Sequence, residues 1–180
     1  IGSCVDWMAR KDCLALYIPE IVLGKRFFSR VRRFERGFYD GTVVDAARFY
    51  RKSVYDELGG WDESLIGPED WDFDKKLRRL GRVDLLEPSS SADGVEAAGW
   101  EFTDFIRARG VDPAGRSGVI YHNESEFELG GYLRKKDFYL QTLDVYFARW
   151  GRDDADVKKQ FGFWYRYFVV FLENGKWRKL

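Results

Sequence analysis

The sequence predicts a mixed α/β fold in which helices flank a small mixed sheet. Short runs of apolar and β-branched residues alternate along the chain with segments whose apolar residues recur every three or four positions, as is typical of this class. A length of 180 residues is sufficient for one domain with its own core. Neither an internal repeat nor a convincing linker divides the chain, so we expect a single domain.

The first predicted elements are a strand over 17–23, a helix over 25–39 and a strand over 42–50. Pro19 places the first strand at a sheet edge or at a strand end, because proline lacks the N–H of a strand ladder. β-branched and aromatic residues predict the second strand. The helix ends before Gly41 and is indicated by apolar residues at spacings of three, four and seven. These residues are Phe27, Phe28, Val31, Phe34 and Phe38.

The middle of the chain contains the most clearly marked element, a helix over 69–80. Acidic residues occupy its first turn and basic residues its last, an arrangement that the helix dipole favours. A shorter helix over 53–58 precedes it and is stopped by Gly59 and Gly60. A strand over 83–86 follows it.

The second half of the chain is expected to be mainly helical. Composition predicts loops and turns, and apolar periodicity predicts helices. In order, we expect a loop over 88–94, a helix over 95–109, turns over 111–118, a strand over 119–122 and long helices over 129–150 and 153–172.

Composition narrows the class of function. Lys and Arg number 30, as do Asp and Glu, so the net charge is zero and we expect no nucleic-acid partner, which would require a basic excess. Aromatic residues make up 18% of the chain, which favours a large core or a surface that holds sugar rings. Cys4 and Cys13 are too few for a disulfide framework, and neither a signal peptide nor a membrane-spanning segment is visible. These features favour a cytoplasmic location.

Four short segments occur in an informative order: 44–51 (VDAARFYR), 59–63 (GGWDE), 69–72 (EDWD) and 120–124 (IYHNE). Together they resemble the second half of a family 2 glycosyltransferase, which has the GT-A fold. The resemblance covers most of the chain and is weakest over 88–118. It implies an inverting enzyme that transfers a sugar from a nucleotide-diphospho-sugar donor to a glycan or lipid-linked acceptor and uses Mg²⁺ or Mn²⁺.

By this resemblance, two acidic residues carry the chemistry. Asp70 would be the general base that takes the proton from the acceptor hydroxyl, and Glu69 would position the acceptor or the base. An alternative interpretation needs no catalysis, since acidic residues are common in the first turn of any helix. The surrounding motifs favour the catalytic interpretation.

The resemblance also implies residues that bind substrate and metal. His122, the only histidine, would ligate the metal at the end of a late strand. Aromatic rings would stack on a sugar, and polar groups would contact the sugar or the diphosphate; these residues are Trp61, Trp71, Asp62, Arg48, Lys135 and Lys136. The alternatives stay open at this stage: a lone histidine can be structural, and basic residues can form a solvated helix face.

The family's Asp-x-Asp metal motif has no counterpart in the early part of the chain, and 154–156 (DAD) is expected to begin a helix as a cap. We therefore expect one partial domain, inactive alone, whose nucleotide-binding half is missing. Within it, 1–87 would be part of the GT-A core, 88–118 an insertion, and 119–180 the late strand and C-terminal helices.

Other classes of function compete with the enzyme. The chain could be a carbohydrate- or protein-binding module without turnover, or a degenerate transferase kept as a partner subunit. For the enzyme, we expect a cytoplasmic protein that associates peripherally with the inner face of a membrane, where a lipid-linked acceptor would be found.

Overall fold

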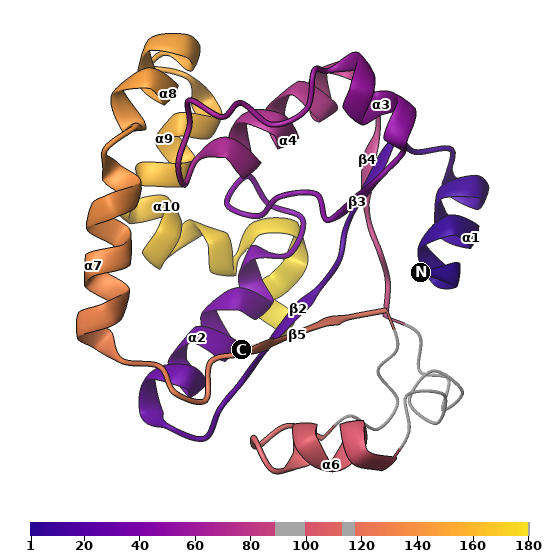
Figure 1. Cartoon of the computed structure of the whole chain (residues 1–180), viewed down its shortest axis with the longest axis vertical. Coiled ribbons are helices and arrows are strands. Elements are labelled where there is room, and N and C mark those ends of the chain that lie inside the picture. Colours follow the sequence, from indigo (N-terminus) through magenta and orange to yellow (C-terminus); the bar gives the residue numbers. More distant parts are fainter. Residues whose placement is uncertain (89–99, 113–117, 180) are drawn as a thin grey trace.

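The computed structural model describes residues 1–88, 100–112 and 118–179, and it confirms a mixed α/β fold (Figure 1). Two small sheets lie at its centre. In the first, β1 (Ala15–Tyr17) pairs antiparallel with β3 (Phe49–Tyr50) and parallel with β4 (Val83–Leu85). In the second, β2 (Glu20–Leu23) runs parallel to β5 (Ile120–Asn123).

Pro19 separates the two sheets. The strand predicted over 17–23 is broken there, because β1 ends at Tyr17 and β2 begins at Glu20. Proline cannot donate to a strand ladder, although its carbonyl accepts a hydrogen bond from the N–H of Ile120 at 2.9 Å. The chain thus leaves one sheet and enters the other within a few residues.

Most helices lie on one side of the strands in the view of Figure 1, and α1 (Gly2–Lys11) and α6 (Trp100–Arg107) lie on the other. None of the helices in the described part of the chain is long and apolar enough to cross a membrane. In chain order they are α1 (Gly2–Lys11), α2 (Phe27–Tyr39), α3 (Lys52–Glu57), α4 (Glu69–Leu80), α6 (Trp100–Arg107), α7 (Leu129–Leu140), α8 (Leu143–Trp150), α9 (Ala155–Phe161), α10 (Phe163–Tyr167), and the 3₁₀ turns η1 (Val169–Phe171) and η2 (Glu173–Lys179).

Helix α4 begins and ends where the sequence predicts. Phe73 and Leu77 on its inner face are buried against Ala15 of β1 and Val54 of α3. The signals at its two ends are local. They are acidic residues in the first turn, Arg78 in the last turn, and Gly81, at which the backbone leaves helical geometry. Helix α4 is thus fixed by the core cluster that it shares with β1 and α3.

Helix α2 is confirmed, but its apolar stripe does not face the core. Only Phe38 of the five stripe residues is buried, whereas Phe27, Phe28, Val31 and Phe34 remain substantially exposed. The helix is instead held on β2 by polar contacts, in which Arg33 donates to the carbonyls of residues 22 and 24.

The strand predicted over 42–50 is wrong apart from Phe49–Tyr50. Side chains hold this segment in turns: the Thr42 hydroxyl donates to the carbonyl of Tyr39, and the Asp45 carboxylate accepts from the N–H groups of Gly41 and Ala46. Such local side-chain bonds compete with strand pairing.

The two long C-terminal helices predicted are each divided. The segment 129–150 breaks between α7 and α8, where the Thr142 hydroxyl bonds both to the N–H and to the carbonyl of Ile66. The segment 153–172 breaks at Gly162, where a Cβ would lie 2.2 Å from the carbonyl oxygen of Lys158. The first break thus has a partner in a distant loop, whereas at the second the close backbone of Lys158 leaves room only for glycine.

Part of the predicted insertion lies outside the described residues, including most of the loop over 88–94, the start of the helix over 95–109 and most of the turns over 111–118. Helix α6 confirms the remainder of that helix, and β5 confirms the strand predicted over 119–122, shifted by one residue. The predicted cap is also confirmed, since the Asp154 carboxylate accepts from the N–H groups of residues 156 and 157.

Candidate functional site

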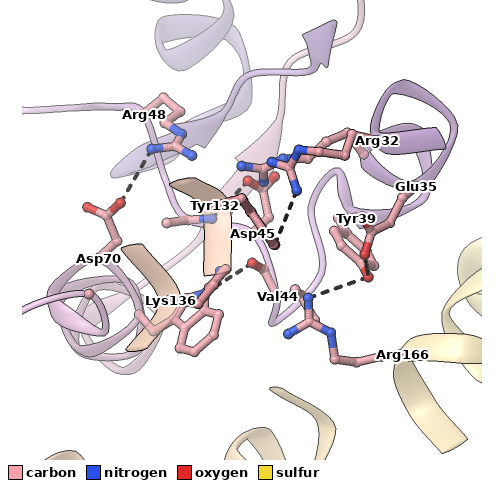
Figure 2. Close-up of a pocket in the computed structure, with 14 residues that line it drawn as sticks. Arg32, Glu35, Tyr39, Val44, Asp45, Arg48, Asp70, Tyr132, Lys136 and Arg166 are labelled. Atoms are coloured by element: carbon pink, nitrogen blue, oxygen red, sulfur yellow. Dashed lines mark hydrogen bonds and ion pairs between the residues drawn. The ribbon is translucent and has the colours of Figure 1, made fainter. Parts of the chain in front are cut away.

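A cleft opens beside the first turn of α4, between α2, α7 and α10 (Figure 2). Its central pocket has a volume of about 150 Å³. A polar pocket of about 560 Å³ and an apolar pocket of about 530 Å³ adjoin it. Tyr132 and Lys136 line all three, so we treat them as the central, polar and apolar parts of one cleft.

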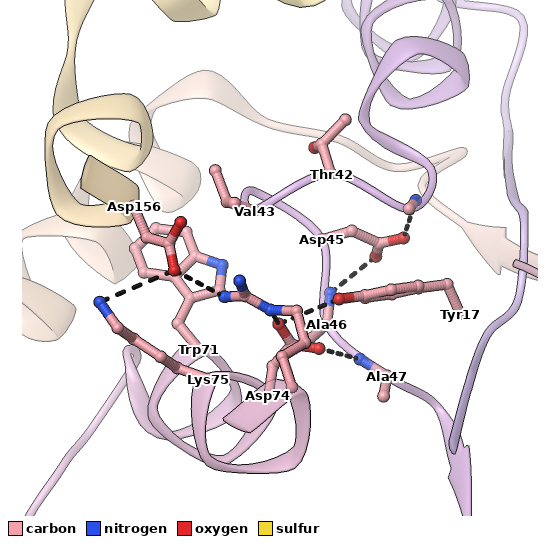
Figure 3. Close-up of polar contacts among 12 residues, drawn as sticks. Tyr17, Thr42, Val43, Asp45, Ala46, Ala47, Trp71, Asp74, Lys75 and Asp156 are labelled. Carbon is pink, nitrogen blue, oxygen red and sulfur yellow. Dashed lines mark hydrogen bonds and ion pairs between the residues drawn. The ribbon is translucent and has the colours of Figure 1, made fainter. Parts of the chain in front are cut away.

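The loop over 42–48 forms one wall of the central part and is anchored from beneath by α4 (Figure 3). Asp74, which is buried, accepts hydrogen bonds from the Tyr17 hydroxyl at 3.1 Å, from Arg78 Nε at 2.9 Å and from the N–H of Ala47 at 3.2 Å. A single carboxylate on α4 therefore ties the helix to β1 and to the wall of the cleft.

Asp70 lies in the first turn of α4 and borders the central part of the cleft. Its side chain is 44% exposed, and Oδ2 accepts from Arg48 Nη1 at 3.4 Å (Figure 2). The residue before α4 is Pro68, which provides no side-chain cap. Asp70 is thus a carboxylate that a substrate hydroxyl can reach, which is the first requirement of a general base.

The aromatic and acidic neighbours of Asp70 take different positions. Trp71 borders both the central and the apolar parts, with its indole N–H donating to the carbonyl of Val44 at 3.0 Å. Glu69 has a buried carboxylate oxygen, Oε2, without a hydrogen-bond partner among the described residues. Trp71 therefore contributes to the lining of both parts, and Glu69 retains an unused acceptor.

Trp61 and Asp62 are not among the described residues that line the cleft. Trp61 is half exposed and packs edge-on against Tyr55. Asp62 accepts hydrogen bonds from Ser64 and Arg149, which hold its pKa well below the usual range. Asp62 therefore anchors its loop to α8.

His122 lies in the polar part of the cleft, at the end of β5. Its Nδ1 is 2.7 Å from Oε1 of Glu20, and since a carboxylate only accepts, Nδ1 carries the proton. The neutral ring would then keep a lone pair on Nε2. A carboxylate that orients a histidine in this way is the usual second partner of a metal-ligating imidazole.

The fit to a metal ion is limited to this one nitrogen. No group of three or more His, Cys, Asp or Glu side chains in the described part of the chain is arranged to hold a metal. Glu20 and Glu124 lie beside His122 but pair with arginines, including the contact of Arg32 Nη2 with Glu124 Oε1 at 2.9 Å. His122 fits as a single ligand.

Alternating charges connect Asp70 to His122. Arg48 lies 3.4 Å from Asp70 and 3.7 Å from Glu20, and Glu20 in turn contacts His122 and Arg36. This row of side chains runs from α4 through β2 to β5, although Glu20 is not among the described residues that line the cleft. A change of charge at either end therefore alters the electrostatic field at the other.

The cleft is more basic than the sequence motifs suggest. Arg32 and Arg36 of α2 and Arg166 of α10 line its central part with Arg48 and Lys136, against the three acidic residues Glu35, Asp45 and Asp70. Partial burial, followed by repulsion from Arg166, Arg32 and Arg36, lowers the pKa of Lys136. The positive charge is thus concentrated enough to affect its own members, which favours an anionic ligand.

Sequence reasoning missed Arg166, and it missed Arg32 and Arg36 as site residues. Their spacing of four positions was the available signal. Lys135 lines the polar part of the cleft with Lys136, and its Nζ lies 5.4 Å from the ring centre of Tyr139. The structure therefore brings together Asp70, Trp71, Arg48, Lys135, Lys136 and His122.

Asp45 is a buried carboxyl in the wall of the central part, and burial raises its pKa to about 6. Since the pKa in the unfolded chain is lower, this group stabilises the fold below about pH 4, and its contribution is lost as the pH rises through 6. The loss corresponds to about 3 kcal/mol. In urea titrations between pH 4 and 8, Asp45→Asn is therefore expected to become more stable relative to the wild type as pH rises. A constant difference across this range would contradict the assignment.

Comparison with protein-family models, with curated proteins and with solved structures found no match to this chain. Its function is therefore inferred from the sequence motifs and the cleft.

Proposed function

We propose that this protein is an inverting glycosyltransferase that uses a nucleotide-diphospho-sugar donor, with Asp70 as the general base. The observation that carries the proposal is the position of an accessible carboxylate, Asp70, at the edge of a cleft with a basic centre. The sequence motifs around Asp70 supply the class of reaction, and the cleft supplies groups of the required charge.

The proposed reaction needs a proton acceptor at one place in the cleft and positive charge at another. Asp70 takes the proton of the acceptor hydroxyl as that oxygen attacks the anomeric carbon. Negative charge develops on the departing diphosphate, and cationic side chains fixed in advance stabilise it. Arg32, Arg36 and Lys136 are suited to this task, because they line the same central part of the cleft as Asp70 but come from α2 and α7.

The apolar part of the cleft suits an acceptor that carries a sugar on an apolar chain. Trp71 provides a ring between the central and apolar parts, and Leu140, Leu143 and Phe163 line the apolar part beyond it. A sugar stacked on Trp71 would therefore have its hydroxyls near Asp70 and its lipid toward α10.

A divalent cation such as Mg²⁺ or Mn²⁺, when bound, would offset the charge of the leaving diphosphate. His122 is the residue that would hold it, with Glu20 keeping the proton on the other ring nitrogen. We further propose a GT-A fold whose donor-binding half lies outside this chain, and a cytoplasmic site of action at the inner face of a membrane.

A donor screen of the protein expressed from its complete reading frame tests the proposal. Incubation with a panel of nucleotide-sugars and a lipid-linked acceptor is expected to consume one donor, release its nucleoside diphosphate and give a product of inverted anomeric configuration. Product analysis by mass spectrometry and NMR would show this. Binding of a glycan without consumption of any donor would favour the non-catalytic binding module instead.

A further inference from the structure

A surface of exposed aromatic residues covers α10 and the turns that follow it. Trp164 is 71% exposed, Tyr167 62% and Phe168 52%, and Leu172 and Trp177, later in the chain, are also exposed. Neighbouring aromatic side chains are rarely so exposed. Where they are, the apolar patch marks a site of interaction. We name the exposed residues of 161–179 the aromatic surface.

Four rings of the aromatic surface form one connected cluster. Phe163 contacts Trp164, Tyr167 and Phe168 with ring centres 5.9, 4.7 and 6.2 Å apart, and Trp164 contacts Phe168 at 5.1 Å. Beneath them, Tyr165 and Val170 are buried against the body of the protein. The cluster is therefore held in place from below and presents its rings outward.

Basic residues accompany the aromatic surface. Residues 161–179 contain four Lys or Arg and one Glu, a net charge of +3. Because the whole chain is neutral, the remaining residues carry −3. Arg178 and Lys179 are exposed, whereas Arg166 lines the central part of the cleft, and Lys176 is buried and donates to the carbonyls of Phe38 and Asp40. The segment that carries the exposed rings is thus net positive.

We infer that the aromatic surface docks on an anionic lipid bilayer. Trp and Tyr are favoured at the boundary between lipid headgroups and acyl chains. Adjacent Lys and Arg are attracted to anionic headgroups. A short, charged segment with exposed rings lies in this boundary without crossing the membrane. The length of α10, from Phe163 to Tyr167, fits only such a shallow position.

The docking surface meets the cleft. Phe163 and Tyr167 line its apolar part together with Trp71, so this part of the cleft lies next to the proposed membrane contact. A lipid-linked substrate could therefore enter from the bilayer and present its sugar near Asp70. This last step rests on the proposed function, whereas membrane docking does not.

Vesicle cosedimentation of the full-length protein tests the docking. The protein is expected to bind vesicles of phosphatidylcholine mixed with phosphatidylglycerol, and to bind pure phosphatidylcholine more weakly. Replacing Trp164 and Phe168 together with Ala should lower binding at least about tenfold, because the rings supply the apolar contact. High salt should weaken the binding of the wild type by screening its basic residues.

A matched control is available on α2, where Phe27 and Phe28 also form an exposed aromatic pair, with ring centres 5.4 Å apart. Phe27→Ala combined with Phe28→Ala should bind vesicles as the wild type does. Equal loss in both double variants, or no vesicle binding by the full-length protein, would overturn the inference. So would a change from dimer to monomer on replacing Trp164 and Phe168 without any vesicle binding, because the surface would then join two copies of the chain.

Different experimental results would overturn the glycosyltransferase proposal and the docking proposal. Vesicle binding without transfer of any sugar would remove the glycosyltransferase and leave the docking surface. Transfer to a soluble acceptor without vesicle binding would do the opposite.

Discussion

Replacing Asp70 with Asn is expected to slow sugar transfer by about 10²–10⁴-fold, the range for loss of a general base. Asparagine keeps nearly the same size and can still accept from Arg48, which lies 3.4 Å away in the wild type, but it cannot take a proton. Transfer rates of the full-length protein, measured at saturating donor, would show the effect. Affinity for the nucleotide-sugar, measured by calorimetry, should change little.

A suitable control for this substitution is Asp56→Asn. Asp56 is an exposed acid on α3 that pairs with Lys52, at a distance of 2.6 Å, and is not among the described residues that line the cleft. This variant should transfer sugar at the wild-type rate. If Asp70→Asn also kept the wild-type rate, Asp70 would not be the base, and the acidic first turn of α4 would be a helix-stabilising feature.

Replacing Phe73 with Ala is expected to destabilise the protein by about 3–5 kcal/mol. Phe73 is buried to 2% exposure in the core cluster of α4, and its ring contacts those of Tyr50, Tyr55 and Trp61. Removing it leaves a cavity where α3, α4 and the first sheet meet. Urea unfolding followed by tryptophan fluorescence would measure the loss.

Phe27→Ala provides the comparison for Phe73→Ala. Phe27 is 73% exposed on α2, so its removal should change the free energy of unfolding by about 0.5 kcal/mol or less. Similar losses in the two variants would mean that the Phe73 cluster does not form the main core around α4.

The parts of the fold that were predicted correctly depend on local signals. Helix α4 is specified by charges in its own first and last turns and by Gly81 at its end, so its limits could be predicted from the sequence. The conformation of the segment 42–50 could not be predicted in this way. Trp71 Nε1 bonds to the carbonyl of Val44, and Asp74 bonds to the N–H of Ala47, each from 27 positions away. The favourable strand composition is overridden by these distant partners.

The candidate site was predictable to the same degree. Asp70, Trp71 and Arg48 belong to motifs that the sequence displays, and they do meet in the cleft. The contribution of Arg166 to the basic lining could not be anticipated, because Arg166 is far from Arg32 and Arg36 in the chain. Nor could the partner of His122, since its contact with Glu20 depends on the register in which β2 pairs with β5.

The two sides of the cleft differ in how firmly they are held. Helix α4 buries five of its residues, including Phe73 and Leu77, whereas all residues of α7 remain at least partly exposed. Main-chain amides in α4 should therefore exchange slowly and those in α7 quickly. The cleft has one stiff wall, which carries Asp70, and one compliant wall, which carries Tyr132 and Lys136. Ligands of different size can then be accommodated by displacing α7, while the carboxylate on α4 keeps its position.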